Sequence, residues 1–140
     1  MSSPTTLFCY GTLCFPDIML AVCGHRSVPQ TASLVGYQCY TLADVVYPAV
    51  VPETGGLTQG VMYHGVTLQQ QALLDAYEGE QYQRDVLSVR DAQQQSWQAW
   101  VYVLRPRYSS MLTSHHWDRQ EFAHKAKRAY MQAQGWSNTE

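Results

Sequence analysis

The segment Tyr10, Gly11, Thr12, Leu13 interrupts an apolar run that is otherwise typical of a β-strand. A glycine at the end of a strand allows the backbone to approach another group closely. Because Pro16 indicates the start of a helix shortly afterwards, the N–H groups that follow Gly11 can form an anion-binding nest. We therefore expect this segment to hold a substrate carboxylate. The alternative is a tight strand-to-helix turn that needs glycine at positive φ.

Glu78 is the second residue that could do chemistry. It is predicted to end a helix over residues 67–78, because Gly79 follows as a C-terminal stop. The negative end of a helix dipole disfavours a carboxylate, so we expect the pKa of Glu78 to lie above its reference value of about 4.3. From position alone, an ordinary surface glutamate is the alternative. Glu80, two residues further on, is predicted to be solvated.

Tyr82, Arg84 and Tyr102 are further candidates for the wall of a pocket. Arg84 can pair with a carboxylate through its planar guanidinium or act on the helix end, and a structural use is favoured. Tyr102 and Tyr108 belong to a set of ten tyrosines. For each of them a core position with a satisfied hydroxyl is therefore favoured over a place in the pocket.

The sequence lacks the patterns of metal and cofactor chemistry. It has no nucleotide-binding loop and no nucleophile elbow. The five histidines lack zinc spacing, and His115 and His116 are predicted to lie in a loop. The four cysteines, at positions 9, 14, 23 and 39, form no CxxC pair and are expected to be reduced and mostly buried. We predict no metal and no cofactor.

Two segments taken together resemble the γ-glutamylcyclotransferase-like superfamily, and in pattern its plant avirulence-induced-gene-like proteins. They are YGTL at 10–13 and LLDAYEGEQYQR at 73–84. Four more segments are similar to this family in type and order: YPAV at 47–50, GVMYHGV at 60–66, AWVYVL at 99–104 and WDRQEF at 117–122. The resemblance covers most of residues 7–122.

The resemblance implies a cyclisation. The free α-amine of a γ-glutamyl group attacks its own γ-carbonyl, which releases 5-oxoproline and the attached amine. One carboxylate can take the proton from the attacking amine and return it to the leaving amine, so we assign Glu78 as general base and acid. Such a ring closure needs positioning but no metal.

The leaving amine stays open, because YGTL departs from the YGSN and YGSL forms of other branches. Two other functions are alternatives. One is a non-catalytic module that binds a small carboxylate, and the other is an enzyme that removes a γ-glutamyl protecting group in a biosynthetic pathway.

The elements that must position these residues follow from periodicity and turn signals. Strands are predicted at 5–9, 32–41, 45–51, 58–63, 86–90 and 97–104, with a turn at 52–56 and a hairpin connection at 91–96. Helices are predicted at 17–23, at 67–78 and from 118 to just before 135. This order does not alternate as in a parallel α/β sheet. We predict a single α+β domain over residues 1–140, with a curled, barrel-like mixed sheet and a few flanking helices. The alternation within the strands is imperfect, so an open sheet is the alternative to a barrel.

Charge and hydropathy restrict the partners. Nine Lys and Arg stand against eleven Asp and Glu without a like-charge block, so no nucleic acid is expected. Lys125, Lys127 and Arg128 are predicted to form a solvated helix face. No run approaches the length of a membrane span and no signal peptide is recognised, so we expect a cytoplasmic protein without a membrane partner. The expected partner is a small molecule that carries a γ-glutamyl group; oligomeric state stays open.

Overall fold

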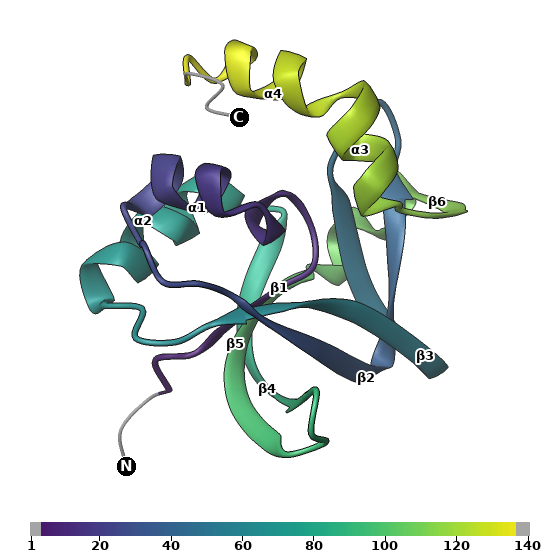
Figure 1. Cartoon of the computed structure of the whole chain (residues 1–140). Helices are drawn as coiled ribbons and strands as arrows, with labels where there is room; N and C mark the ends of the chain where they lie inside the picture. Colours follow the sequence, from purple (N-terminus) through teal and green to yellow (C-terminus); the bar gives the residue numbers. More distant parts are fainter. Residues whose placement is uncertain (1–3, 137–140) are drawn as a thin grey trace.

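The computed structural model describes residues 4–136, and Figure 1 shows the arrangement of its elements. In chain order these are β1 (Leu7–Cys9), the 3₁₀ helix η1 (Thr12–Cys14), α1 (Pro16–Cys23), β2 (Gln30–Leu42), β3 (Pro48–Tyr63), α2 (Leu68–Glu78), β4 (Tyr82–Asp91), β5 (Ser96–Leu104), the 3₁₀ helix η2 (Pro106–Met111), β6 (Leu112–His116), α3 (Arg119–Lys125) and α4 (Lys127–Ala133).

The sheet closes on itself. Its order is β3-β1-β5-β4-β2-β6, and an additional pairing of β3 with β2 joins five strands into a barrel, to which β6 adds at β2. β1 runs parallel to β5, whereas the other pairs are antiparallel. The predicted α+β fold with a barrel-like mixed sheet is therefore confirmed, and so is the hairpin between β4 and β5.

The predicted turn at residues 52–56 is wrong, because β3 runs through it without ending. Val35 pairs with Leu57 and Tyr37 pairs with Pro52, so residues 53–56 stand opposite Gly36 alone. Gly55 takes a positive φ of 78° within this bulge. Proline and glycine here mark an irregularity inside a strand rather than its end.

The first two helices begin and end where their caps indicate. Gly24 follows α1 with a φ of 78°, and Thr67 with Gln70 forms a reciprocal capping box at the start of α2. The predicted third helix is wrong in one respect, because it is broken at Ala126 (φ −131°) into α3 and α4. His115 and His116 also differ from prediction, since they lie in β6 rather than in a loop.

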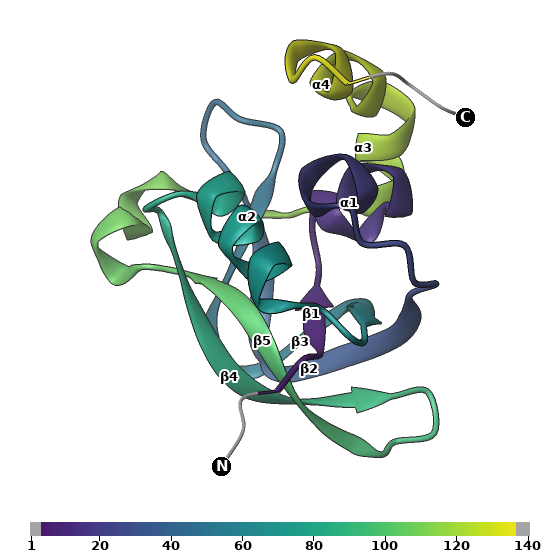
Figure 2. The ribbon, with the colours of Figure 1, turned by 90° about the vertical axis from the view of Figure 1, so that its left-hand side faces the viewer.

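The barrel interior and the helix-covered face carry the two parts of the core. Alternate residues of β1 serve both: Phe8 packs inside with residues of the other four barrel strands, and Leu7 faces the helices. α1 and α2 pack against each other over one end of the barrel (Figure 2). The four cysteines are free and buried, as predicted.

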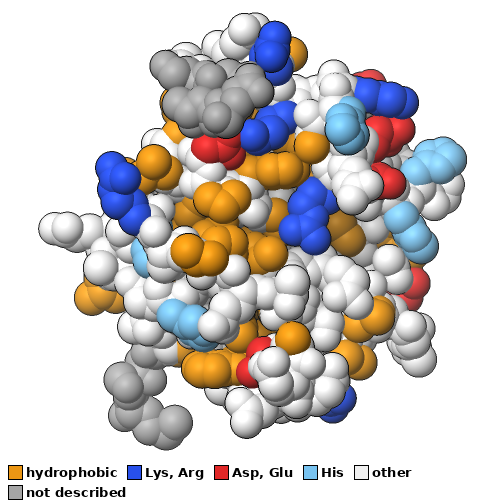
Figure 3. Space-filling view, viewed as in Figure 1, with side chains coloured by type: hydrophobic (Ala, Val, Ile, Leu, Met, Phe, Trp, Pro, Cys, Tyr) orange, Lys and Arg blue, Asp and Glu red, His pale blue; other side chains and the backbone are white. Residues whose placement is uncertain are grey.

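On the face shown in Figure 3, the Lys and Arg side chains are spread apart and form no large basic patch. Within residues 4–136, no helix is long and apolar enough to cross a membrane. The same part of the chain has no group of three or more His, Cys, Asp or Glu that could hold a metal ion.

Gly60 gives a test of barrel closure. A Cβ at this position would lie 2.2 Å from the carbonyl oxygen of Cys9, where β3 crosses β1. We expect Gly60→Ala to lower the free energy of unfolding by about 1 to 3 kcal/mol, as overpacking does elsewhere, measured by urea denaturation. The neighbouring Gln59 is exposed, so Gln59→Ala is the control and should change stability by less than about 0.5 kcal/mol. Equal urea midpoints for the two variants would contradict the close approach of Gly60 to the carbonyl oxygen of Cys9.

Candidate active site

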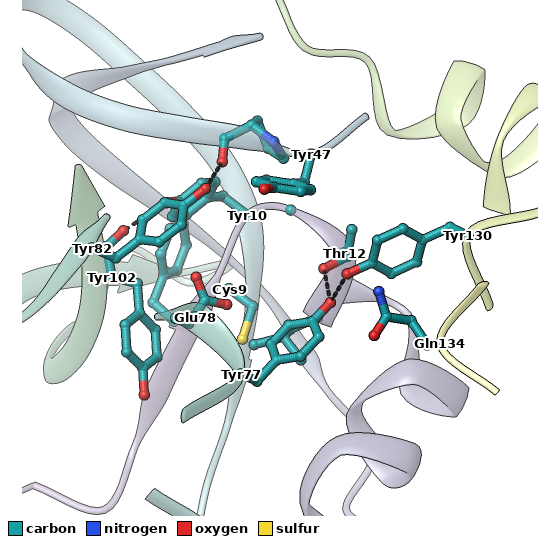
Figure 4. Close-up of a pocket in the computed structure, with 14 residues that line it drawn as sticks. Cys9, Tyr10, Thr12, Tyr47, Tyr77, Glu78, Tyr82, Tyr102, Tyr130 and Gln134 are labelled. Atoms are coloured by element: carbon teal, nitrogen blue, oxygen red, sulfur yellow. Dashed lines mark hydrogen bonds between the residues drawn. The ribbon is translucent and has the colours of Figure 1, made fainter. Parts of the chain in front are cut away.

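A pocket of about 190 Å³ lies where β1 ends, beside the C-terminus of α2 (Figure 4). The end of β1 and the following turn form its buried floor, and α2, β4, β5, α4 and the segment before β3 supply the rest. The lining residues are Phe8, Cys9, Tyr10, Gly11, Thr12, Leu13, Tyr47, Pro48, Tyr77, Glu78, Tyr82, Tyr102, Tyr130 and Gln134. The structure thus brings the 10–13 segment together with Glu78, Tyr82 and Tyr102.

Glu78 is the last residue of α2, and its carboxyl group points into the pocket (Figure 4). It is the one charged side chain among the described residues that line this cavity. None of the hydrogen bonds found within residues 4–136 involves its carboxyl oxygens. A carboxyl group placed in this way is available to a bound molecule.

Burial raises the pKa of Glu78 to about 8, and the negative charge of Asp75 adds to the effect. The direction of the shift predicted from sequence is confirmed, but its leading cause is loss of water rather than the helix dipole. The charge of Glu78 in turn raises the pKa of Cys9, Tyr10 and Tyr82, after the larger effect of burial on each. These groups therefore stay protonated around the carboxyl.

Asp75, one helical turn before Glu78, is held in the opposite state. Burial raises its pKa, but hydrogen bonds from Arg84 and Tyr102 outweigh this and the net pKa is lowered. Arg84 Nε lies 2.9 Å and Nη2 3.1 Å from the two carboxylate oxygens, and the Tyr102 hydroxyl donates at 2.6 Å. Asp75 is therefore ionised, whereas Glu78 can exchange a proton near neutral pH.

Arg84 does not line the pocket. Its guanidinium forms a bidentate pair with Asp75, also donates to Gln71 at 3.2 Å, and lies 4.2 Å from the ring centroid of Trp100. This is the structural use that the sequence favoured.

The 10–13 segment turns sharply from β1 into η1. Gly11 has a φ of −115°, so the alternative of a turn with glycine at positive φ is wrong. Space favours glycine here instead, because a Cβ would lie 3.0 Å from Pro48 Cδ and this ring would have to move by a few tenths of an ångström. The N–H groups at the start of a 3₁₀ turn have no partner within the turn. The backbone N–H groups of Thr12 and Leu13 lie at the start of η1, and both residues line the cavity.

Tyrosine rings form most of the remaining wall, and the protein holds the hydroxyl groups of all of them except Tyr47 by hydrogen bonds. Tyr10 donates to the carbonyl oxygen of Tyr102 at 2.6 Å, and Tyr82 donates to that of Pro48 at 2.7 Å. Tyr108 lies elsewhere and donates to Glu80 at 2.9 Å. Glu80 itself is exposed, as predicted.

Sequence reasoning missed Tyr77, which directly precedes Glu78 in α2, and the two lining residues of the C-terminal helical segment, Tyr130 and Gln134. The Tyr130 hydroxyl hydrogen-bonds that of Tyr77, which in turn lies 2.9 Å from Thr12 Oγ1. Gln134 lies four residues after Tyr130, a spacing that could have identified a shared helix face. Lys127 corrects a further expectation: it is not on a solvated face, because it pairs with Asp17 at 2.6 Å with both side chains only 19% exposed.

A family model described as gamma-glutamyl cyclotransferase, AIG2-like, matches residues 7–119, and the chain belongs to this family. AIG2-like protein A of Arabidopsis thaliana is 31% identical over 83 residues, which are 59% of this chain and 50% of that protein. AIG2-like protein D of the same plant is 28% identical over 102 residues, 70% of this chain and 66% of that protein. The match thus spans about half the length of the first of these relatives.

Solved structures share the fold. A solution structure of a protein from Arabidopsis thaliana superposes with a TM-score of 0.70 at 24% identity, and covers 91% of this chain and 86% of its own. A structure described as gamma-glutamyl cyclotransferase gives a TM-score of 0.66 at 11% identity, with coverage of 99% and 90%. At these identities the likeness shows the architecture alone.

The titration of Glu78 can be measured directly. In a protein labelled with ¹³C-glutamate, we expect one side-chain carboxyl resonance to titrate near pH 8, while glutamates in ordinary surroundings titrate near pH ~4.3. The resonance should be absent from Glu78→Gln. Asp75→Asn should lower this pKa, because it removes the neighbouring negative charge. Titration of every glutamate below pH ~5 would contradict the burial of Glu78.

Proposed function

We propose that this protein is a γ-glutamyl cyclotransferase that converts a small γ-glutamyl compound to 5-oxoproline and a free amine. The observation that supports this most is the Glu78 carboxyl, which faces the pocket without a protein partner and has its pKa raised to about 8. A general acid-base group works best when its pKa lies near the working pH. A module that only bound an anionic ligand would gain nothing from this carboxylate.

The size of the pocket fits the head group rather than a whole peptide. A cavity of about 190 Å³ is smaller than the roughly 300–1,000 Å³ of sites for drug-sized ligands. No Lys, Arg or His is among the described residues that line it. The α-carboxylate of the substrate would therefore be held by N–H groups of the Tyr10 to Leu13 segment, as proposed from the sequence.

The reaction needs one proton carrier. The α-amine nitrogen attacks the γ-carbonyl carbon and forms the ring C–N bond, while Glu78 removes a proton from this nitrogen. Breakdown of the tetrahedral intermediate cleaves the original amide C–N bond, and Glu78 returns the proton to the leaving nitrogen. No water is consumed, and the carboxylate is regenerated.

Positioning supplies the rest of the catalysis. Both reacting groups belong to one molecule, so holding the γ-glutamyl chain bent gives the ring closure a high effective molarity. The rings of Tyr10, Tyr82 and Tyr102 are fixed by their hydrogen bonds. A rigid, largely buried wall of this kind is suited to fixing the bent conformation.

Glu78→Gln tests the assignment. It keeps the size of the side chain but removes the titrating group, so turnover should fall by about 10² to 10⁴, measured as 5-oxoproline release across a panel of γ-glutamyl compounds. Because attack needs the carboxylate, kcat/KM of the wild type should rise with pH through about 8. The substrate amine loses its proton in the same direction and adds to the rise.

Glu80→Gln is the matched control, because Glu80 lies two residues away and is 75% exposed. It should retain normal turnover. Normal turnover in both variants would show that neither Glu78 nor Glu80 drives the reaction. Loss of turnover in Glu80→Gln alone would move the catalytic role to Glu80.

Acetylation of the substrate α-amine gives an independent test. The proposed nucleophile comes from the substrate, so the N-acetylated compound should release no amine while the parent compound does. Amine production is followed by chromatography of both reactions. Undiminished release from the acetylated compound would indicate hydrolysis instead of cyclisation.

A further inference from the structure

Helix α4 supplies a part of the pocket wall to which the cyclisation assigns no role. Tyr130 and Gln134 line the pocket and lie four residues apart, on one face of this helical segment. Gln134 follows the last residue of α4 and keeps a helical backbone, with φ −83° and ψ −7°. The family match ends at residue 119, so these two residues lie beyond the segment that defines the family.

An ion pair fastens the start of α4 to α1. Lys127 Nζ lies 2.6 Å from Asp17 Oδ2, and each side chain is only 19% exposed. Lys127 also lies over the ring of Phe15, at 5.2 Å from the centroid. Because Phe15 directly precedes α1, the helix is tied to the same turn that forms the pocket floor.

Aromatic contacts fasten the other end. The Tyr130 hydroxyl hydrogen-bonds the Tyr77 hydroxyl, which reaches Thr12 Oγ1 at 2.9 Å. The ring of Trp136 lies 6.1 Å from that of Tyr77 and 6.3 Å from that of Tyr130. Tyr77 directly precedes Glu78 in α2, so α4 is held at a fixed position relative to the catalytic carboxyl.

Gln134 presents an unused hydrogen-bonding group at this wall. Its backbone N–H donates to the carbonyl oxygens of Tyr130 and Met131. Its side-chain carboxamide takes part in none of the hydrogen bonds found within residues 4–136. Figure 4 shows the Gln134 side chain on the same side of the pocket as Tyr77 and Tyr130. Gln134 is exposed, whereas the residues of the 10–13 floor are buried.

We propose that Gln134 selects the leaving amine. The inference rests on the proposed function: with the γ-glutamyl head group on the floor beside Glu78, the leaving amine extends toward the opening of the pocket, and Gln134 is the one exposed residue among the described residues that line it. A carboxamide is neutral and both donates and accepts hydrogen bonds. It therefore favours a leaving amine that carries a neutral hydrogen-bonding group near the scissile nitrogen over an alkyl amine of the same shape.

Two substrates of matched shape test this: γ-glutamylglycinamide and γ-glutamylisobutylamine share the head group. Their leaving amines differ in the hydrogen-bonding group and also in basicity, so the deciding quantity is the change that Gln134→Leu makes for each substrate. In the wild type, kcat/KM should be about threefold to tenfold higher for the glycinamide, the value of one net hydrogen bond. Gln134→Leu should lower kcat/KM for the glycinamide by this factor and leave the isobutylamine within about twofold. Release of 5-oxoproline is the readout for both.

Gln132→Leu is the control, because Gln132 is exposed on α4 and is absent from the pocket lining. Gln132→Leu should leave kcat/KM unchanged for both substrates. Equal loss for both substrates in Gln134→Leu, or no loss for either, would overturn the role of Gln134. A wild type that releases 5-oxoproline from both compounds at equal rates overturns this inference alone. A wild type that releases it from neither overturns the proposed function, and the inference with it.

Discussion

Barrel closure through β1 is the constraint on which the site depends. This strand has only three residues, yet it pairs with β3 on one edge and with β5 on the other. Both of its faces are buried as well. The chain must therefore leave β1 inside the end of the barrel and turn at once, which places Tyr10 and Gly11 against Pro48 and the end of α2.

The closed end of the barrel also decides the electrostatics. Two carboxyl groups lie three residues apart in α2, and the guanidinium of Arg84 in β4 pairs with Asp75. Glu78 receives burial and a negative neighbour instead, so its pKa rises while that of Asp75 falls. The difference in protonation follows from which carboxyl group Arg84 can reach, because a paired charge tolerates loss of water and an unpaired one does not.

Local signals predicted the fold wherever one short segment decides the outcome. The capping box at Thr67, the stop at Gly79 and the hairpin between β4 and β5 depend on neighbouring residues alone. The turn predicted at residues 52–56 is wrong because pairing of β3 with β2 overrides the turn composition. The extra residues are accommodated as a bulge. The break at Ala126 likewise carries no glycine or proline, and no local signal marks it.

The sequence by itself determined the family, the α+β class and the placement of Glu78 at a helix end, since these depend on motif order and local capping. Closure of the sheet into a barrel was decided by the pairing of β3 with β2. Only the tertiary structure decided that burial, more than the helix dipole, raises the pKa of Glu78. It also decided that Arg84 stays outside the pocket and that Tyr130 and Gln134 line it. The physical reason is that desolvation and long-range contacts depend on which distant segments meet, and no local pattern records this.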